Sequence, residues 1–191
     1  MLVDDEGLHG MVKRCGTKTL TAGAHVVYVE GFQAGGGVGM NVRYSGPDTG
    51  GKEMLLRSGM VPSVPGKYFA QCDPTAAGLD LSSFIVCIFR SDKGLGSIPQ
   101  LGAADTEGST LHYVGKGSMS VVDVRSSGDF RKAVGKTPDE NFAWGIIGQL
   151  KVKKEGAYNL CIESDDGLKN AILYRIFRSS IIWSFFLCAM G

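Results

Sequence analysis

The sequence predicts an all-β protein, and three observations lead to that prediction. β-Branched, aromatic and other apolar residues recur in short runs, several of which alternate with polar residues as half-buried strands do. The 28 glycines gather at the ends of these runs without a collagen-like period, as tight turns between short strands require. At 191 residues and 43% hydrophobic content, the chain suits one domain, or one domain and part of another.

The N-terminal part of the chain is predicted to form strands joined by glycine-rich turns. Residues 11–31 are predicted as strands, with a turn at 21–23 followed by the alternating run 24–29. A glycine loop at 35–39 leads into a second alternating run at 40–44. The Gly-Lys-Ser/Thr of a phosphate-binding loop does not follow these glycines, so we expect a hairpin loop there.

A second β unit begins near Phe84. The apolar run 84–89 is short enough for a buried strand. Further strands are predicted at 111–114, 120–124, 142–147, 150–152 and 158–162, and a short helix at 127–134. Gly167 follows Asp165 and Asp166, which predicts a tight hairpin at this point because glycine readily adopts a positive φ.

Two segments lack a strand pattern. Residues 58–82 carry three prolines and no clean period, so they are predicted to be a linker. Residues 171–191 are apolar and nearly free of glycine. The uninterrupted apolar part, 181–190, is too short to span a bilayer, and a longer window includes two arginines. We therefore expect an atypical, non-native tail and no membrane association through it.

Charge and cysteine content narrow the function classes. The formal net charge is +1 and the basic residues are scattered, which argues against a nucleic-acid partner. The five cysteines contain no CxxC pair and are widely spaced, so a zinc site is not expected, whereas one or two disulfides of open connectivity are compatible with a secreted protein. No signal peptide follows Met1, so we expect a start within a longer gene and an extracellular or cell-surface setting for the whole protein.

Two sets of motifs resemble the PA14 family, a β-sandwich module of adhesins, glycosidases and cell-surface proteins. The front half of that module resembles the aromatic strand 144–150, the run 156–160 and the Ser-Asp-Asp-Gly motif at 164–167. The back half resembles Asp-Glu-Gly-Leu-His-Gly at 5–10 and the His-containing strand at 20–29. The resemblance implies an antiparallel β-sandwich.

The order of these motifs is reversed relative to the family. Residues 1–57 are therefore predicted to be the rear of one PA14-like copy, and residues 83–170 the front of the next. The alternative is that the permuted halves complete a single sandwich, because a sandwich depends on which strands pair more than on where the chain ends lie.

Asp165 and Asp166 are the predicted metal ligands. In sugar-binding members of the resembled family, an aspartate pair holds calcium and the calcium holds sugar hydroxyls; calcium takes oxygen ligands. The alternative is a turn in which the aspartates cap backbone amides. Asp4 and Asp5 form a second, weaker pair, and His25 is expected to be structural. The aromatic residues Phe142, Trp144 and Tyr158 are expected to fill the core.

The sequence predicts a binding protein and no catalytic residues, since no nucleophile motif or other catalytic constellation occurs. The expected ligand is a carbohydrate or glycoprotein, with calcium as a candidate cofactor. Three alternatives remain open: a spacer in an extracellular repeat protein, an accessory domain of a glycoside-processing enzyme, and an incomplete product that does not fold alone.

Overall fold

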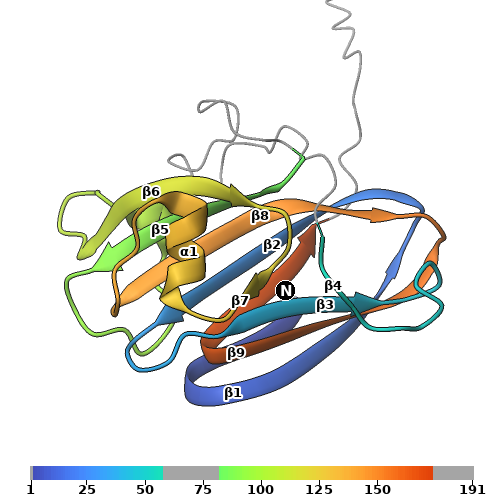
Figure 1. Cartoon of the computed structure of the whole chain (residues 1–191), viewed down its shortest axis with the longest axis horizontal. Coiled ribbons are helices and arrows are strands. Elements are labelled where there is room, and N and C mark those ends of the chain that lie inside the picture. The colour runs from blue at the N-terminus through green and yellow to red at the C-terminus, as the bar shows by residue number, and fades with distance from the viewer. Residues whose placement is uncertain (1, 58–81, 174–191) are drawn as a thin grey trace, which may run out of the picture.

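The computed structural model describes residues 2–57 and 82–173, and it confirms the all-β prediction. The elements are β1 (Val3–Leu20), β2 (Gly23–Gln33), β3 (Met40–Ser45), β4 (Met54–Leu55), β5 (Phe84–Ser91), the 3-10 helix η3 (Leu101–Ala103), β6 (Leu111–Met119), β7 (Asp123–Val124), α1 (Ser127–Val134), β8 (Phe142–Val152) and β9 (Gly156–Leu173). All strand pairs in this part of the chain are antiparallel (Figure 1).

The predicted elements are largely present, and the differences concern their boundaries. The helix predicted at 127–134 is α1, and the run 84–89 lies within β5. The two strands predicted at 142–147 and 150–152 are parts of the single strand β8. Of the strand predicted at 120–124, only Asp123 and Val124 are paired as β7.

The sheet curls because β9 has different partners along one of its edges. The strand order is β4-β3-β9-β2-β8-β5-β6, with β1 on β9 and β7 on β3. The first half of β9, through Ser164, pairs with β3, and its second half, from Leu168, pairs with β2. β1 follows β9 on the opposite edge from Gly156 to Asn170. Strands from either side of this change therefore face each other across the core (Figure 1).

The N-terminal and C-terminal segments build one sheet together. β2 pairs with β8 and β9, and β1 and β3 both pair with β9. The described strands of the two segments therefore belong to one curled antiparallel sheet, whereas the assignment of 1–57 and 83–170 to parts of PA14-like copies stays a prediction. The predicted linker lies outside the described residues except for Ser82.

The first residues of the predicted tail, 171–173, belong to β9. β9 continues to Leu173, and residues 174–191 lie outside the described part of the chain. Across residues 2–57 and 82–173, no helix is both long enough and apolar enough to cross a membrane.

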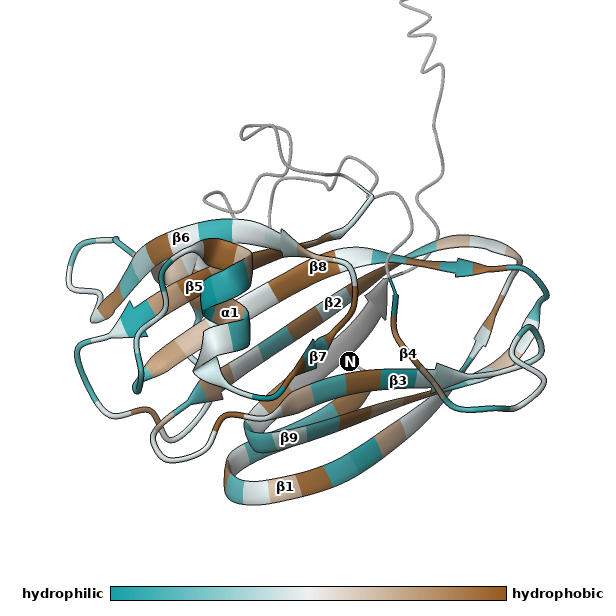
Figure 2. Ribbon diagram, in the orientation of Figure 1, coloured by the Kyte–Doolittle hydropathy of each residue, from teal (hydrophilic) through white to brown (hydrophobic). Residues whose placement is uncertain are grey.

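Aromatic side chains fill the space between the facing strands. Phe142, Trp144 and Tyr158 are at most 2% exposed, as predicted from strand alternation. Phe130 anchors α1 on this core, with its ring centroid 4.9 Å from that of Trp144. Figure 2 shows the hydrophobic bands along β5 and β8 that these contacts bury. Burial of such side chains is the main favourable contribution to folding.

The hairpin predicted at Ser164–Gly167 is wrong, because β9 runs through these residues without a turn. Gly167 does not form a turn; its lack of a side chain allows close packing. A Cβ added at Gly167 would lie 2.4 Å from Cε1 of Phe32 and 3.1 Å from the Gly7 nitrogen. The turn-like motif at 5–10 is likewise part of β1, where the register shifts between Asp5 and Val12 mark bulges.

Candidate functional site

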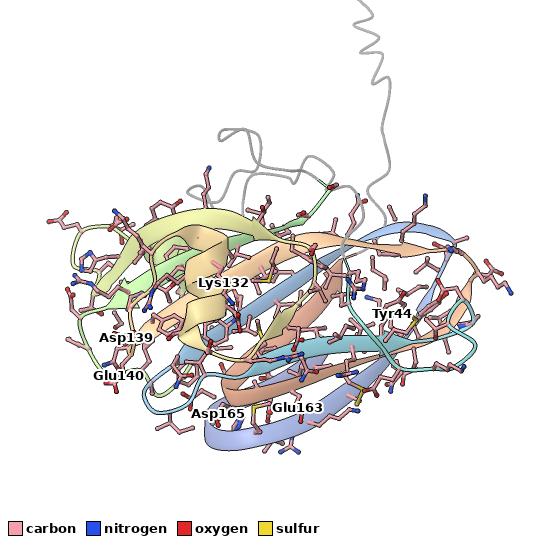
Figure 3. All side chains as sticks on the ribbon, in the orientation of Figure 1. Tyr44, Lys132, Asp139, Glu140, Glu163 and Asp165 are labelled. Carbon is pink, nitrogen blue, oxygen red and sulfur yellow. A yellow bond between two sulfur atoms is a disulfide. The ribbon has the colours of Figure 1, made fainter. Side chains whose placement is uncertain are left out.

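A pocket of about 590 Å³ opens over β3 and β9, where the glycine loop 35–39 joins β2 to β3. Its size falls within the range of small-molecule sites, roughly 300–1,000 Å³. Polar and apolar side chains share the lining: Met11, Val38, Met40, Asn41, Arg43, Leu55, Asp123, Val124, Arg125, Glu163 and Asp165, together with Gly37 and Gly39. Glu163 and Asp165 project from β9 on this side of the molecule (Figure 3).

Strand alternation places both β9 carboxylates in the pocket. Glu163 and Asp165 are two residues apart, so they lie on the same face of the strand, while Ser164 between them is 1% exposed. Glu163 Oε2 accepts a hydrogen bond from Asn41 Nδ2 at 2.9 Å, and Asn41 Oδ1 accepts one from Arg43 Nε at 3.1 Å. These contacts orient three side chains of the pocket floor.

Asp165 has a different environment from Glu163. Its backbone N–H donates to the Gly39 carbonyl at 3.0 Å, which fixes the strand against the glycine loop. A Cβ added at Gly37 would lie 3.0 Å from Asp165 Oδ2, so the loop backbone approaches the carboxylate closely. No described residue donates a hydrogen bond or forms an ion pair to this carboxylate. Asp165 is thus available to a ligand.

The opposite rim of the pocket is set by the segment between β7 and α1. Arg125 Nη2 donates to Asp123 Oδ2 at 2.9 Å, and this hydrogen bond raises the pKa of the Arg125 guanidinium. The Arg125 backbone N–H donates to Asp129 Oδ2 at 3.0 Å. That bond, followed by the one from Lys132, lowers the pKa of Asp129. The start of α1 therefore holds Arg125 at the rim, with its charge balanced by Asp123.

Asp166 is buried on the other face of β9, 8% exposed, although it adjoins Asp165. Its Oδ2 accepts a hydrogen bond from the Ala34 backbone N–H at 2.9 Å. Burial is the main cause that raises the pKa of Asp166; the Ala34 N–H opposes it, and the charge of Asp165 adds to it. This is the amide-capping role that the sequence left open as the alternative to metal binding.

The two predicted metal ligands therefore do not face one cation in this geometry. Within residues 2–57 and 82–173, no group of three or more His, Cys, Asp or Glu side chains is placed to hold a metal ion. Asp5, from the weaker pair, is buried and lies 3.2 Å from Arg14 Nε and 3.3 Å from His9 Nε2. Calcium binding through Asp165 and Asp166 remains a prediction.

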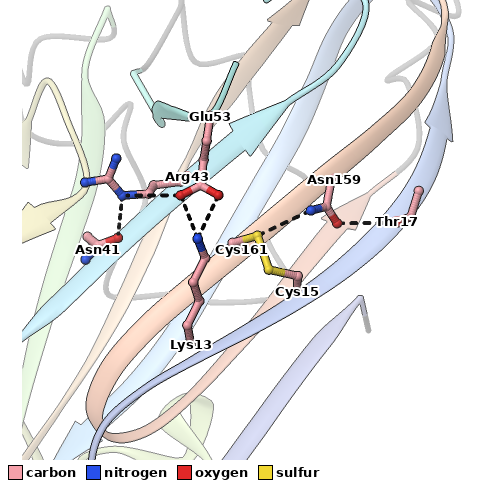
Figure 4. The surroundings of a disulfide bond; sticks show 8 residues. All are labelled: Lys13, Cys15, Thr17, Asn41, Arg43, Glu53, Asn159 and Cys161. Carbon is pink, nitrogen blue, oxygen red and sulfur yellow. Dashed lines mark hydrogen bonds and ion pairs between the residues drawn. A yellow bond between two sulfur atoms is a disulfide. The ribbon is translucent and has the colours of Figure 1, made fainter. Parts of the chain in front are cut away.

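β1 supplies the pocket wall on the far side of β9. Met11 lines the pocket, and a Cβ added at Gly39 would lie 2.8 Å from its sulfur. Lys13 Nζ donates to both oxygens of Glu53, at 2.8 and 2.7 Å, above the outer face of β9 (Figure 4). Glu53 also lies 3.7 Å from Arg43 Nε. This wall is continuous with the floor through Arg43.

A disulfide joins β1 to β9 beside this wall. Cys15 and Cys161 are directly opposite in the ladder, and their sulfurs are bonded (Figure 4). Thr17 and Asn159, two residues further along the strands, are joined by a 3.3 Å hydrogen bond. The sequence left the disulfide connectivity open, because Cys15 and Cys161 are 146 residues apart and only strand pairing brings them together.

Sequence reasoning found one residue of this pocket and missed the others. The sequence predicts Asp165 as a site residue but makes no such prediction for Glu163 or for the Asp123–Arg125 pair. The signal for Glu163 was present, since it stands two residues from Asp165 in a strand. Asp139, which precedes β8 in the chain, is 85% exposed and paired with Arg131, and it does not line the pocket. His25 is buried and its Nε2 donates to the Thr21 carbonyl, so its predicted structural environment is present.

Comparison of the chain with protein-family models, with curated proteins and with solved structures finds no match.

Proposed function

We propose that this chain is a non-catalytic binding module of the PA14 type that binds a carbohydrate, free or on a glycoprotein, in the pocket over β3 and β9. The observation that carries the proposal is the Asp165 carboxylate, which faces the pocket without a partner among the described residues. A sugar hydroxyl donates well to such a carboxylate, and hydrogen bonds to charged groups are the stronger ones.

The remaining lining suits a polar, uncharged ligand. Asn41 and Arg43 offer donors, while Glu163 offers an acceptor that is already oriented by Asn41. Met11 and Val38 provide apolar surface on which the C–H face of a sugar ring can lie. Acidic and basic groups both line the pocket, so an overall charge on the ligand is not required.

The disulfide supports an extracellular or cell-surface setting for this binding. Disulfides such as Cys15–Cys161 persist in oxidising compartments and are rare in the cytosol. Glycans are abundant in that setting, which agrees with the proposed ligand.

Glycan-array screening followed by calorimetry on the best ligand tests the proposal. Asp165→Asn keeps the shape and removes the charge, and we expect it to weaken binding by about 10-fold or more, the value of a charged hydrogen bond. Asp139→Asn is the matched control, because Asp139 is exposed outside the pocket, and it should leave affinity within about 2-fold.

Each outcome of these binding measurements distinguishes between the proposed function and one of its alternatives. Binding that is lost in a chelator and restored by calcium supports the calcium-assisted form, whereas binding indifferent to the chelator supports direct hydrogen bonding. A chain that unfolds cooperatively but binds no glycan contradicts the proposal and favours a spacer role. Equal affinity of Asp165→Asn and wild type contradicts the assignment of the pocket.

A further inference from the structure

β1 is attached to the molecule in an unusual way for so long a strand. Between Glu6 and Thr19 none of its side chains is buried, and the buried positions are confined to its ends, at Val3, Asp5 and Leu20. The hydrophobic contacts that stabilise β2, β5 and β8 are therefore missing along most of β1. Segments with few buried apolar contacts open locally at low free energy.

Backbone pairing, polar side-chain contacts and a disulfide hold the second half of β1, and the side-chain contacts include the Thr17–Asn159 hydrogen bond and the Arg14–Asp5 ion pair. The ladder to β9 pairs it from Val12 to Leu20, and β9 is its only strand partner among the described residues. The Lys13–Glu53 ion pair is substantially exposed, so solvent screens it. The third contact is the Cys15–Cys161 disulfide in the middle of this ladder, and it is covalent.

The two cysteines differ in access to solvent. Cys15 is exposed on β1, whereas Cys161 is 3% exposed on β9. Thiol–disulfide exchange requires a thiolate to reach one of the sulfurs. The exposed Cys15 side of the bond offers that approach without prior unfolding of the core.

We infer that the Cys15–Cys161 bond is a redox-sensitive lock that fastens the second half of β1 to β9 and thereby completes the pocket wall. A dithiol reductant supplies two electrons and two protons: its first thiolate forms a mixed disulfide with Cys15 and releases Cys161 as a thiol. Its second thiolate then displaces Cys15, so the protein ends with two thiols and the reductant with a cyclic disulfide. Residues 12–19 then open and close on β9 while the core remains folded.

Opening of β1 disturbs the pocket at two points. Met11 immediately precedes the released segment and lines the pocket, and Lys13 loses its position over Glu53, which lies 3.7 Å from Nε of the pocket-lining Arg43. Reduction is therefore expected to weaken ligand binding. This consequence rests on the proposed function, whereas the release of β1 itself does not.

Hydrogen exchange followed by mass spectrometry on the whole chain tests the lock. Three samples are compared: wild type, wild type treated with a dithiol reductant, and the variant carrying Cys15→Ser and Cys161→Ser. The double variant isolates this bond from any other disulfide. Thr17→Ala is the matched control, because it removes the side-chain contact to Asn159 from the same ladder and leaves the bond intact.

We expect exchange in peptides covering 12–19 to rise about 100-fold in the reduced and double-variant samples. In the double variant, peptides from β2, β5 and β8 should change by less than about 2-fold, and Thr17→Ala should resemble wild type. Unchanged exchange at 12–19 overturns the inference. Equal acceleration across the whole molecule in the double variant also overturns it, since the Cys15–Cys161 bond would then stabilise the entire fold.

The exchange measurement needs no ligand, so failure of glycan binding leaves it interpretable. If wild type binds a glycan, the same reduced sample should bind it more weakly. Release of β1 with unchanged glycan affinity would overturn the link between the lock and the pocket.

Discussion

Substitution of Asp166 distinguishes a structural carboxylate from a metal ligand. Asp166→Ala removes the acceptor for the Ala34 N–H and leaves that donor unpaired in a part-buried place. A donor left unsatisfied in a part-buried place costs about 1 kcal/mol, the lower end of the range for buried donors, and loss of the buried carboxylate's packing adds about 1–2 kcal/mol, so we expect a loss of about 2–3 kcal/mol. For a domain of this size the melting temperature should fall by about 4–12 °C.

Asp166→Asn is the matched variant, since it keeps an oxygen that can accept from Ala34 and removes the charge that burial disfavours. We expect it to change the free energy of unfolding by less than about 1 kcal/mol at neutral pH. Urea denaturation of both variants, monitored by tryptophan fluorescence, measures the difference. The capping role would be refuted if Asp166→Asn destabilised the protein as much as Asp166→Ala does. The metal role would be restored if calcium stabilised wild type and Asp166→Asn abolished that stabilisation.

The pH dependence provides an independent check with a definite sign. Because burial raises the pKa of Asp166 in the folded state, the protonated form is favoured by folding. The stabilisation that comes from protonated Asp166 is fully present below the pKa of this residue in the unfolded state, and it is lost as the pH rises through the pKa in the folded state. Wild type should therefore gain stability relative to Asp166→Asn as the pH is lowered from 7 towards 4. A relative loss over this range would show that the Ala34 hydrogen bond outweighs burial.

Two core substitutions test the packing. Gly148→Ala places a Cβ 2.1 Å from Cδ1 of Phe84. We expect this overpacking to lower the free energy of unfolding, measured by urea denaturation, by about 1–3 kcal/mol. Gly94→Ala is the control, because its Cβ would have no atom within 4 Å, and it should change the free energy of unfolding by less than about 0.5 kcal/mol. Similar values for the two glycines would contradict the contact. Phe130→Ala removes the side chain that anchors α1, and we expect it to lower the free energy of unfolding, measured by calorimetry, by about 3–5 kcal/mol. A loss below about 1 kcal/mol would contradict the burial of Phe130 against Trp144.

The pocket shows why sequence patterns reached only part of the site. Alternation along 158–162 predicted β9 but could not show where the strand ends, because Asp165, Asp166 and Gly167 are also typical turn residues. Local preference favoured a hairpin. Pairing of the next residues with β2 outweighed it, since a strand in the middle of a sheet gains hydrogen bonds on both edges. Continuing the strand sent the two aspartates to opposite faces.

Residues that come from separate strands were beyond the reach of local patterns. Glu163 contacts Asn41 across 122 positions, and Asp123 and Arg125 reach the same pocket from the segment that follows β6. In the sequence, nothing distinguishes these residues from other polar surface residues. Their grouping depends on β3 lying between β9 and β7, which is a property of the sheet order alone.

The sequence by itself determined the β class, the positions of most strands, the helix at 127–134 and the burial of the aromatic residues, because these follow from short-range periodicity and side-chain hydrophobicity. The tertiary structure decided that the two halves share one sheet, that Cys15 pairs with Cys161, and which face each carboxylate occupies. The physical reason is that strand pairing joins residues more than a hundred positions apart. The sequence of a strand shows which of its residues share a face, but it does not show with which other strand it pairs.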